Sequence, residues 1–203
     1  MRSKRRSWNK LVEVLHSEDS IVRFSAVTDL WEYDRPEVYE LLLEALSDKD
    51  ESIKGAAIGS LGRLGDKRAV DHLIKELLDG SSGIQVNAAE ALWLIGDARA
   101  LEPLLSVLEQ NNPTLRAVAA RALLKMPNPR AFNALQALLN DSSEGVRFAA
   151  VGALMAQSKA LGFDICTILQ RVSTQDPSKH VRELAAIYLE ELDDHNLIES
   201  SGE

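Results

Sequence analysis

The chain has 203 residues and only one cysteine, Cys166. A single cysteine excludes a disulfide within the chain, and such cysteine usage is typical of a reducing compartment. No uninterrupted apolar run approaches the roughly 20 residues that a membrane-spanning helix needs. The basic start Met1–Arg6 is not followed by an apolar segment, so we expect no secretion signal. These absences predict a cytoplasmic protein without a membrane anchor.

Residues that carry chemistry are also scarce, with four histidines and 5 % aromatic residues. The histidines have no cysteine or carboxylate at metal-ligand spacing on a shared helix face, which predicts no metal site. Cys166 has no sequence partner that would mark it as a nucleophile. The glycine-rich string 59–65 lacks the Gly-Lys-Ser/Thr ending of a phosphate-binding loop. We therefore predict no catalytic residues and no cofactor.

The net charge of −8 is unevenly distributed. Residues 1–10 hold five of the 23 basic residues, so the remaining chain carries 18 basic and 31 acidic residues. An acidic body argues against nucleic-acid binding, which depends on neutralising phosphates. We interpret residues 1–7 as a basic N-terminal tail and residues 195–203 as an acidic C-terminal tail.

What the sequence does contain is a repeat with a period of 31 residues. Each repeat has an apolar anchor, a short capping residue three positions earlier and, usually, a basic residue one position later. Self-similarity at a fixed period of this length indicates an array of stacked units. The apolar anchors are Val22, Ile53, Ile84, Leu115 and Val146, with a sixth match at Val181.

Each anchor begins a predicted helix. Apolar or small residues return four, five, eight and eleven positions after the anchor, which is the spacing of one buried helical stripe. The capping residues suit the helix start, and Gly65 and Gly96 suit its end. A second apolar pattern, such as Val70, Leu73 and Leu77, precedes each anchor. Each unit is therefore a helix pair, helix A followed by helix B.

Six such pairs follow one another in a single array over residues 8–194. We expect the unit boundaries to fall near residues 8–34, 35–65, 66–96, 97–127, 128–160 and 161–194. The expected fold class is all-α, an α-solenoid in which each pair completes its core on its neighbours.

The segment Asp50–Asp66, followed by Lys67–Val70, resembles the HEAT repeat in its short, phycobilisome-lyase-type form. Residues 81–100 and 143–154 follow the same pattern, and the resemblance extends from about residue 8 to residue 192. Pro127-Asn-Pro129 departs from the pattern by replacing its Gly-Asp turn. The resemblance implies an α-solenoid of six HEAT-like helix pairs whose B helices line a concave face.

On that face, positions two, six and nine after each anchor lie opposite the buried stripe. In the first five units they hold mainly aromatic, aliphatic or glycine residues, which predicts a protein-binding groove. Gly55, Gly59 and Gly62 would form a notch between aromatic walls. The alternative is that Trp31 and Trp93 pack between neighbouring B helices as core. The predicted protein-binding residues are Phe24, Trp31, Gly55, Gly59, Val86, Glu90, Trp93, Arg121, Lys125 and Phe148.

The leading functional hypothesis is a non-catalytic scaffold or adaptor that binds another protein on the concave face. A second copy of the chain could occupy the same stripe as a homodimer. The resemblance also implies an alternative, a phycobilisome-associated factor such as a bilin lyase subunit or a degradation protein. Two HEAT-like enzymes fit the sequence less well. A deoxyhypusine hydroxylase carries repeated His-Glu pairs, and none is present. An alkylpurine DNA glycosylase needs a cationic groove to hold the duplex, whereas the body of this chain is acidic.

Overall fold

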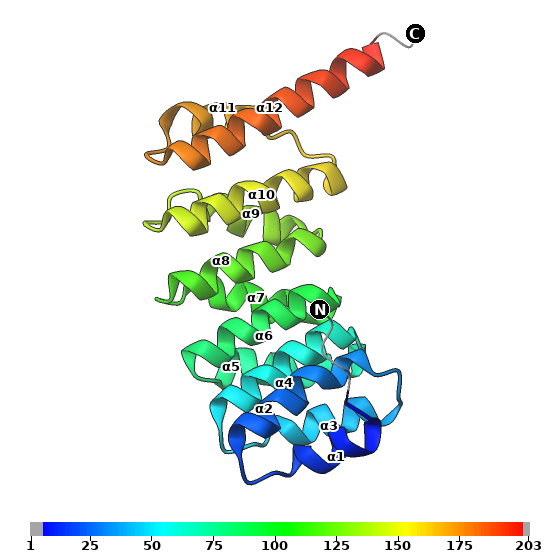
Figure 1. The fold of residues 1–203 in the computed structure, drawn as a ribbon. Helices are drawn as coiled ribbons and strands as arrows, with labels where there is room; N and C mark the ends of the chain where they lie inside the picture. Colours follow the sequence, from blue (N-terminus) through cyan, green and yellow to red (C-terminus); the bar gives the residue numbers. More distant parts are fainter. Residues whose placement is uncertain (1–5, 201–203) are drawn as a thin grey trace. The chain divides into compact units, whose positions relative to one another are not determined.

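The computed structural model describes residues 6–200, with side chains described as far as Asp193. This part of the chain contains twelve α-helices, five short 3-10 segments and no β-strand. Its contacts divide it into two compact units, one ending at Arg99 and the other beginning at Ala100. In Figure 1 the first unit runs from blue to green and the second from green to red. The helices form six consecutive A–B pairs, so the predicted HEAT-like α-solenoid is confirmed.

The first compact unit contains three pairs. The B helices α2, α4 and α6 pack against one another in sequence, and each also packs against the A helix before it. The elements are α1 (Trp8–Leu15), α2 (Ser20–Asp29), η1 (Leu30–Glu32), α3 (Glu37–Ala45), α4 (Glu51–Leu64), η2 (Lys67–Ala69), α5 (Val70–Asp79) and α6 (Ser82–Ile95).

The second compact unit repeats this arrangement, with the B helices α8, α10 and α12 packed in sequence. A short segment, η3 (Ala98–Ala100), spans the boundary at which this unit begins. Its elements are α7 (Leu101–Ser106), η4 (Val107–Glu109), α8 (Pro113–Ala122), η5 (Leu123–Lys125), α9 (Pro129–Leu138), α10 (Glu144–Leu161), α11 (Cys166–Gln175) and α12 (Lys179–Ser200).

The helix ends follow the sequence signals. The side chains of Asp19, Asp50 and Asn112 accept hydrogen bonds from first-turn amides of α2, α4 and α8. Gly65 and Gly96 end α4 and α6 with positive φ angles of 71° and 68°, the left-handed conformation that favours glycine. Every anchor from Ile53 onward is buried, whereas Val22 in the terminal pair is only partly buried.

The irregular turn Pro127-Asn-Pro129 is held by one fully buried side chain, Gln157 of α10. Its amide nitrogen donates to Leu123 O at 2.6 Å and Met126 O at 3.0 Å, and its amide oxygen accepts from Asn128 N at 2.8 Å. Leu123 O also accepts from Met126 N at 3.0 Å, so Gln157 adds to a backbone contact already present in the turn. Its three hydrogen bonds join α10 to the backbone of the turn that replaces the Gly-Asp turn.

In three of the pairs, the arginine after the anchor binds the A–B loop of the next pair. Nε of Arg23, Arg116 and Arg147 donates at 2.8 Å to a carboxylate in that loop, and Nη2 donates to the other carboxylate oxygen. We call these contacts the aspartate–arginine ladder. Its pairs are Arg23–Asp48, Arg116–Asp141 and Arg147–Asp176.

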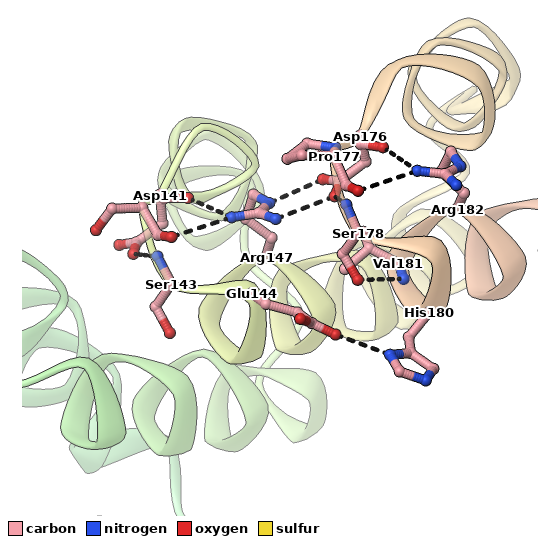
Figure 2. A network of polar contacts seen from close by, with 11 residues as sticks. Asp141, Ser143, Glu144, Arg147, Asp176, Pro177, Ser178, His180, Val181 and Arg182 are labelled. Carbon is pink, nitrogen blue, oxygen red and sulfur yellow. Dashed lines mark hydrogen bonds and ion pairs between the residues drawn. The ribbon is translucent and has the colours of Figure 1, made fainter.

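Each arginine of the ladder also closes its own loop, as Figure 2 shows for Arg147. Its Nη1 donates to Asp141 O at 2.8 Å, while Asp176 Oδ1 accepts from Ser178 N at 2.8 Å. Arg182 ends the series by donating to Asp176 O at 2.6 Å. The ladder therefore fixes both the conformation of each loop and the stacking of one pair on the next.

The partner in the ladder is an aspartate two residues before the capping position, and not the capping residue itself. Within the first compact unit the ladder changes after Arg23. Lys54 lies 3.8 Å from Glu76, and Gln85 Nε2 donates to Leu77 O at 3.0 Å. These longer or neutral contacts bind less strongly than a bidentate arginine pair.

We expect Arg147→Met to lower the free energy of unfolding by about 3 kcal/mol, because it leaves the buried Asp176 carboxylate without its counterion. Urea unfolding followed by circular dichroism measures the change. Arg171→Met, on the exposed surface of α11, is the matched control and should change stability by less than about 0.5 kcal/mol. Equal effects of the two substitutions would contradict a structural ladder.

The ladder also predicts a pH dependence of stability. Hydrogen bonds from Arg23 and Arg116 lower the pKa of Asp48 and Asp141. Burial would raise the pKa of Asp176, but Arg147 and the Ser178 amide together lower it. A lowered native pKa stabilises the fold above the unfolded value near 3.9, and this contribution is lost as the pH falls through the native pKa. We expect Asp141→Asn/Asp176→Asn to flatten the loss of thermal stability below about pH 4, as calorimetry would record.

Candidate protein-binding face

The B helices carry most of the large apolar side chains that are exposed in the described part of the chain. Only Leu78 on α5 and Phe163 after α10 are exposed elsewhere. Large apolar side chains on a solvated helix face favour a binding surface, provided that they gather there. The exposed apolar side chains on B helices or their final turns are Ile21, Phe24, Leu94, Leu124, Phe148 and Ile187.

In the first compact unit, the predicted aromatic residues differ in exposure. Phe24 on α2 is 41 % exposed, whereas Trp31 in η1 is half-buried. The Arg63 guanidinium lies 5.6 Å from the Trp31 ring centroid, within the range of a cation–π contact. Trp93 on α6 is also half-buried. The tryptophans therefore combine a packing role with partial exposure, and Phe24 is the exposed anchor.

The three glycines of α4 lie in different surroundings. A Cβ atom at Gly62 would lie 2.7 Å from Ala91 Cα, so this glycine permits the close packing of α4 on α6. A Cβ atom at Gly55 would lie 2.8 Å from Asn87 Nδ2. Only Gly59 opens onto free space, with no atom within 4 Å of its added Cβ. The open part of the predicted notch is therefore at Gly59, since α6 fills the space at Gly62.

The remaining polar and aliphatic positions of the prediction lie on the same two sets of B helices. On α6, Val86 is half-buried and Glu90 is exposed. In the second compact unit, Arg121 and Lys125 are exposed at the end of the α8 segment, and Phe148 on α10 is 45 % exposed. The predicted residues therefore form two groups, one in each compact unit.

The second compact unit also exposes Ile187, which the list of predicted binding residues omits although it lies six positions after its anchor. Its side chain is 58 % exposed on α12, beside α10. A Cβ atom at Gly152 of α10 would lie 3.8 Å from the Tyr188 hydroxyl, its nearest neighbour on α12. We define the α10–α12 patch as Phe148, Gly152, Glu183, Ile187 and Glu190. The sequence signal that could have identified Ile187 as a binding residue is its position in the repeat, six residues after the anchor Val181.

Two features of the described residues bear on catalysis. No group of three or more His, Cys, Asp or Glu side chains among them is arranged to hold a metal ion. A hydrogen bond to Asp164 and burial raise the pKa of the Cys166 thiol, which opposes formation of a nucleophilic thiolate. No helix within the described range is both long and apolar enough to cross a membrane.

A cavity of the first compact unit lies at the A–B loops. It has a volume of about 770 Å³ and is lined by residues of these loops and of α1 to α4, including His16, Glu44 and Asp48. Asp48 is already bound by Arg23 in the ladder, and His16 Nδ1 lies 3.7 Å from Glu44. The cavity is therefore an open recess over the scaffold contacts.

Replacement of Gly62 and of Gly59 by alanine should have opposite effects on stability, because their surroundings differ. Gly62→Ala should lower the free energy of unfolding by about 2 kcal/mol, because the Ala91 backbone has no room for the methyl group. Gly59→Ala should raise it by up to about 1 kcal/mol, since alanine is the better helix former and the space is open. Urea unfolding compares the variants, and a loss of stability in Gly59→Ala would contradict an open site.

Comparison with known structures shows the same fold. The complex of CpcE and CpcF of phycocyanin lyase from Nostoc sp. PCC7120 is 20 % identical, with a TM-score of 0.71 over 91 % of this chain and 76 % of that chain. A designed armadillo repeat protein in complex with the peptide (KR)4 is 20 % identical, with a TM-score of 0.65 over 91 % and 99 %. A computationally designed armadillo repeat protein for modular peptide recognition has a TM-score of 0.59 at 20 % identity over the same shares.

The chain matches no curated protein sequence. The profile of HEAT repeats matches residues 9–93 and 70–155, which together span well over half of the 203 residues. With the six helix pairs and the repeated anchors, these matches show that the chain belongs to the HEAT repeat family.

Proposed function

We propose that this protein is a non-catalytic, cytoplasmic scaffold that binds another protein through its B-helix face. The observation that carries the proposal is the exposure of Phe24, Phe148 and Ile187 on the solvent side of helices whose opposite sides are fully packed. A packed solenoid does not need these side chains for its core. Burial of such anchors against a partner supplies most of the energy in protein interfaces.

The contact surface that we propose keeps the residues expected from the sequence, grouped by compact unit. In the first unit Phe24 is the anchor and Gly59 gives a partner room to approach the α4 backbone. In the second unit Phe148 is the anchor. Around these lie Trp31, Gly55, Val86, Glu90 and Trp93 in the first unit and Arg121 and Lys125 in the second.

The neighbours of similar fold support binding as the function. One is a designed armadillo repeat protein holding a peptide, and another is a complex of two chains, CpcE and CpcF. The second neighbour also supports a narrower alternative, a phycobilisome-associated role such as a lyase subunit. Mixing the protein with apo-phycocyanin and phycocyanobilin tests that role, because attachment of the bilin would change the visible absorbance.

The scaffold proposal predicts that charged substitutions on the B-helix face abolish partner capture. The immobilised wild type is exposed to lysate of the source organism beside Phe24→Asp and Phe148→Asp, and retained proteins are identified by mass spectrometry. Each substitution places a charge where a partner would bury an aromatic ring, so we expect at least a tenfold loss of a specific partner. Circular dichroism verifies that each variant stays helical.

Leu78→Asp is the matched control, because Leu78 is a similarly exposed apolar residue on the A helix α5. It should retain the partner. Loss of the partner in Leu78→Asp as well, or retention by both B-face variants, would contradict binding through the B-helix face.

A further inference from the structure

We infer that the α10–α12 patch accepts a partner segment in which an apolar anchor is flanked by lysine or arginine. The inference rests on the proposed function and specifies the chemistry of the partner at this part of the face. It is carried by the placement of acidic side chains around the exposed apolar residues of the patch.

The apolar centre of the patch is formed by two neighbouring helices. Phe148 on α10 and Ile187 on α12 are 45 % and 58 % exposed. One turn after Phe148 on α10, Gly152 presents no side chain, and the nearest atom to an added Cβ is the Tyr188 hydroxyl of α12 at 3.8 Å. A side chain of a partner could therefore rest against the α10 backbone with Phe148 one turn before it and Ile187 on the adjacent helix.

Acidic residues flank this centre along α12. Glu183 lies one turn before Ile187 and Glu190 lies one turn after it, so all three share one helix face. Both glutamates are exposed. An apolar anchor that binds beside Ile187 would thus have a carboxylate within reach on either side, and cationic flanking residues would match both.

The basic residues of the same two helices do not reverse this charge. Lys179 lies 3.2 Å from Glu183 in an exposed i, i+4 pair, which contributes little to stability and leaves acceptor positions of the Glu183 carboxylate for a partner cation. Lys159 lies 2.7 Å from Glu191. Arg182 donates to the carbonyls of Asp176 and Pro177, which directs its charge to the loop. His180 contacts Glu144 at the start of α10. Glu190 and Asp193 add further negative charge along α12, whereas the exposed cations Arg121 and Lys125 lie on α8 and η5, which pack on α10. The cationic flanks of a partner are therefore expected along α12, beside Ile187.

The test uses two fluorescein-labelled ten-residue peptides with Trp-Leu at the centre. The first peptide has two lysines on each side of this centre. In the second peptide, glutamates replace all of these lysines. Fluorescence anisotropy with the full chain at low salt should show at least fivefold tighter binding of the lysine peptide, the effect of about two exposed ion pairs. The preference should shrink as salt is added.

Variants of the protein distinguish recognition of the peptide's charge from burial of its apolar centre. Glu183→Lys/Glu190→Lys should abolish or reverse the preference for the lysine peptide, whereas Phe148→Asp should weaken binding of both peptides. Glu18→Lys/Glu109→Lys changes the net charge equally at exposed positions outside the patch and should keep the preference. This control distinguishes a local site from general attraction to an acidic protein.

Failure of the inference is distinct from failure of the proposed function. If neither peptide binds, if the two bind equally, or if the control loses the preference as fully as the patch variant, the inference is overturned, while partner capture still decides the function. If sedimentation shows a dimer that Phe148→Asp dissociates, a second copy occupies the patch, and the inference is overturned as well.

Discussion

The stacking of helix pairs is the constraint on which the rest of this structure depends. A single pair of about 31 residues cannot enclose a core, so each B helix must bury one stripe against its own A helix and its flanks against neighbouring B helices. This leaves one face of each B helix without a packing role. The anchors from Ile53 to Val181 are buried for this reason, while Phe24 and Phe148 can remain exposed without loss of the core.

The polar contacts that maintain the stack lie at the A–B loops. In the aspartate–arginine ladder a buried guanidinium satisfies a carboxylate of the next pair and carbonyls of its own loop, so no charged group is left unpaired there. Outside the apolar core, a few charged residues are thus buried at the loops, while a few large apolar residues are exposed on the B-helix face. The loops serve the scaffold, and the exposed apolar face is the surface that we propose for binding.

The sequence was sufficient for the architecture because the determinants of a repeat are local. The anchors, capping residues and terminal glycines predicted the helix pairs, and all six occur. The sequence could not show how the glycines of α4 differ, because Gly62 and Gly59 are equivalent in propensity and differ only in what α6 places beside them. Nor could it show that Gln157 stabilises the turn at Pro127-Asn-Pro129, since that contact joins positions about 30 residues apart.

The same reasoning explains why a HEAT array can change partner without changing fold. Substitution of an anchor or of Arg147 affects two pairs at once, because each contact joins one pair to the next. Substitution of Glu183 or Ile187 changes a face that no other pair covers, so the cost to the core is small. On the proposed function, binding specificity can therefore vary along the B helices independently of stability, and the exposed positions between the anchors are where partner chemistry would be determined.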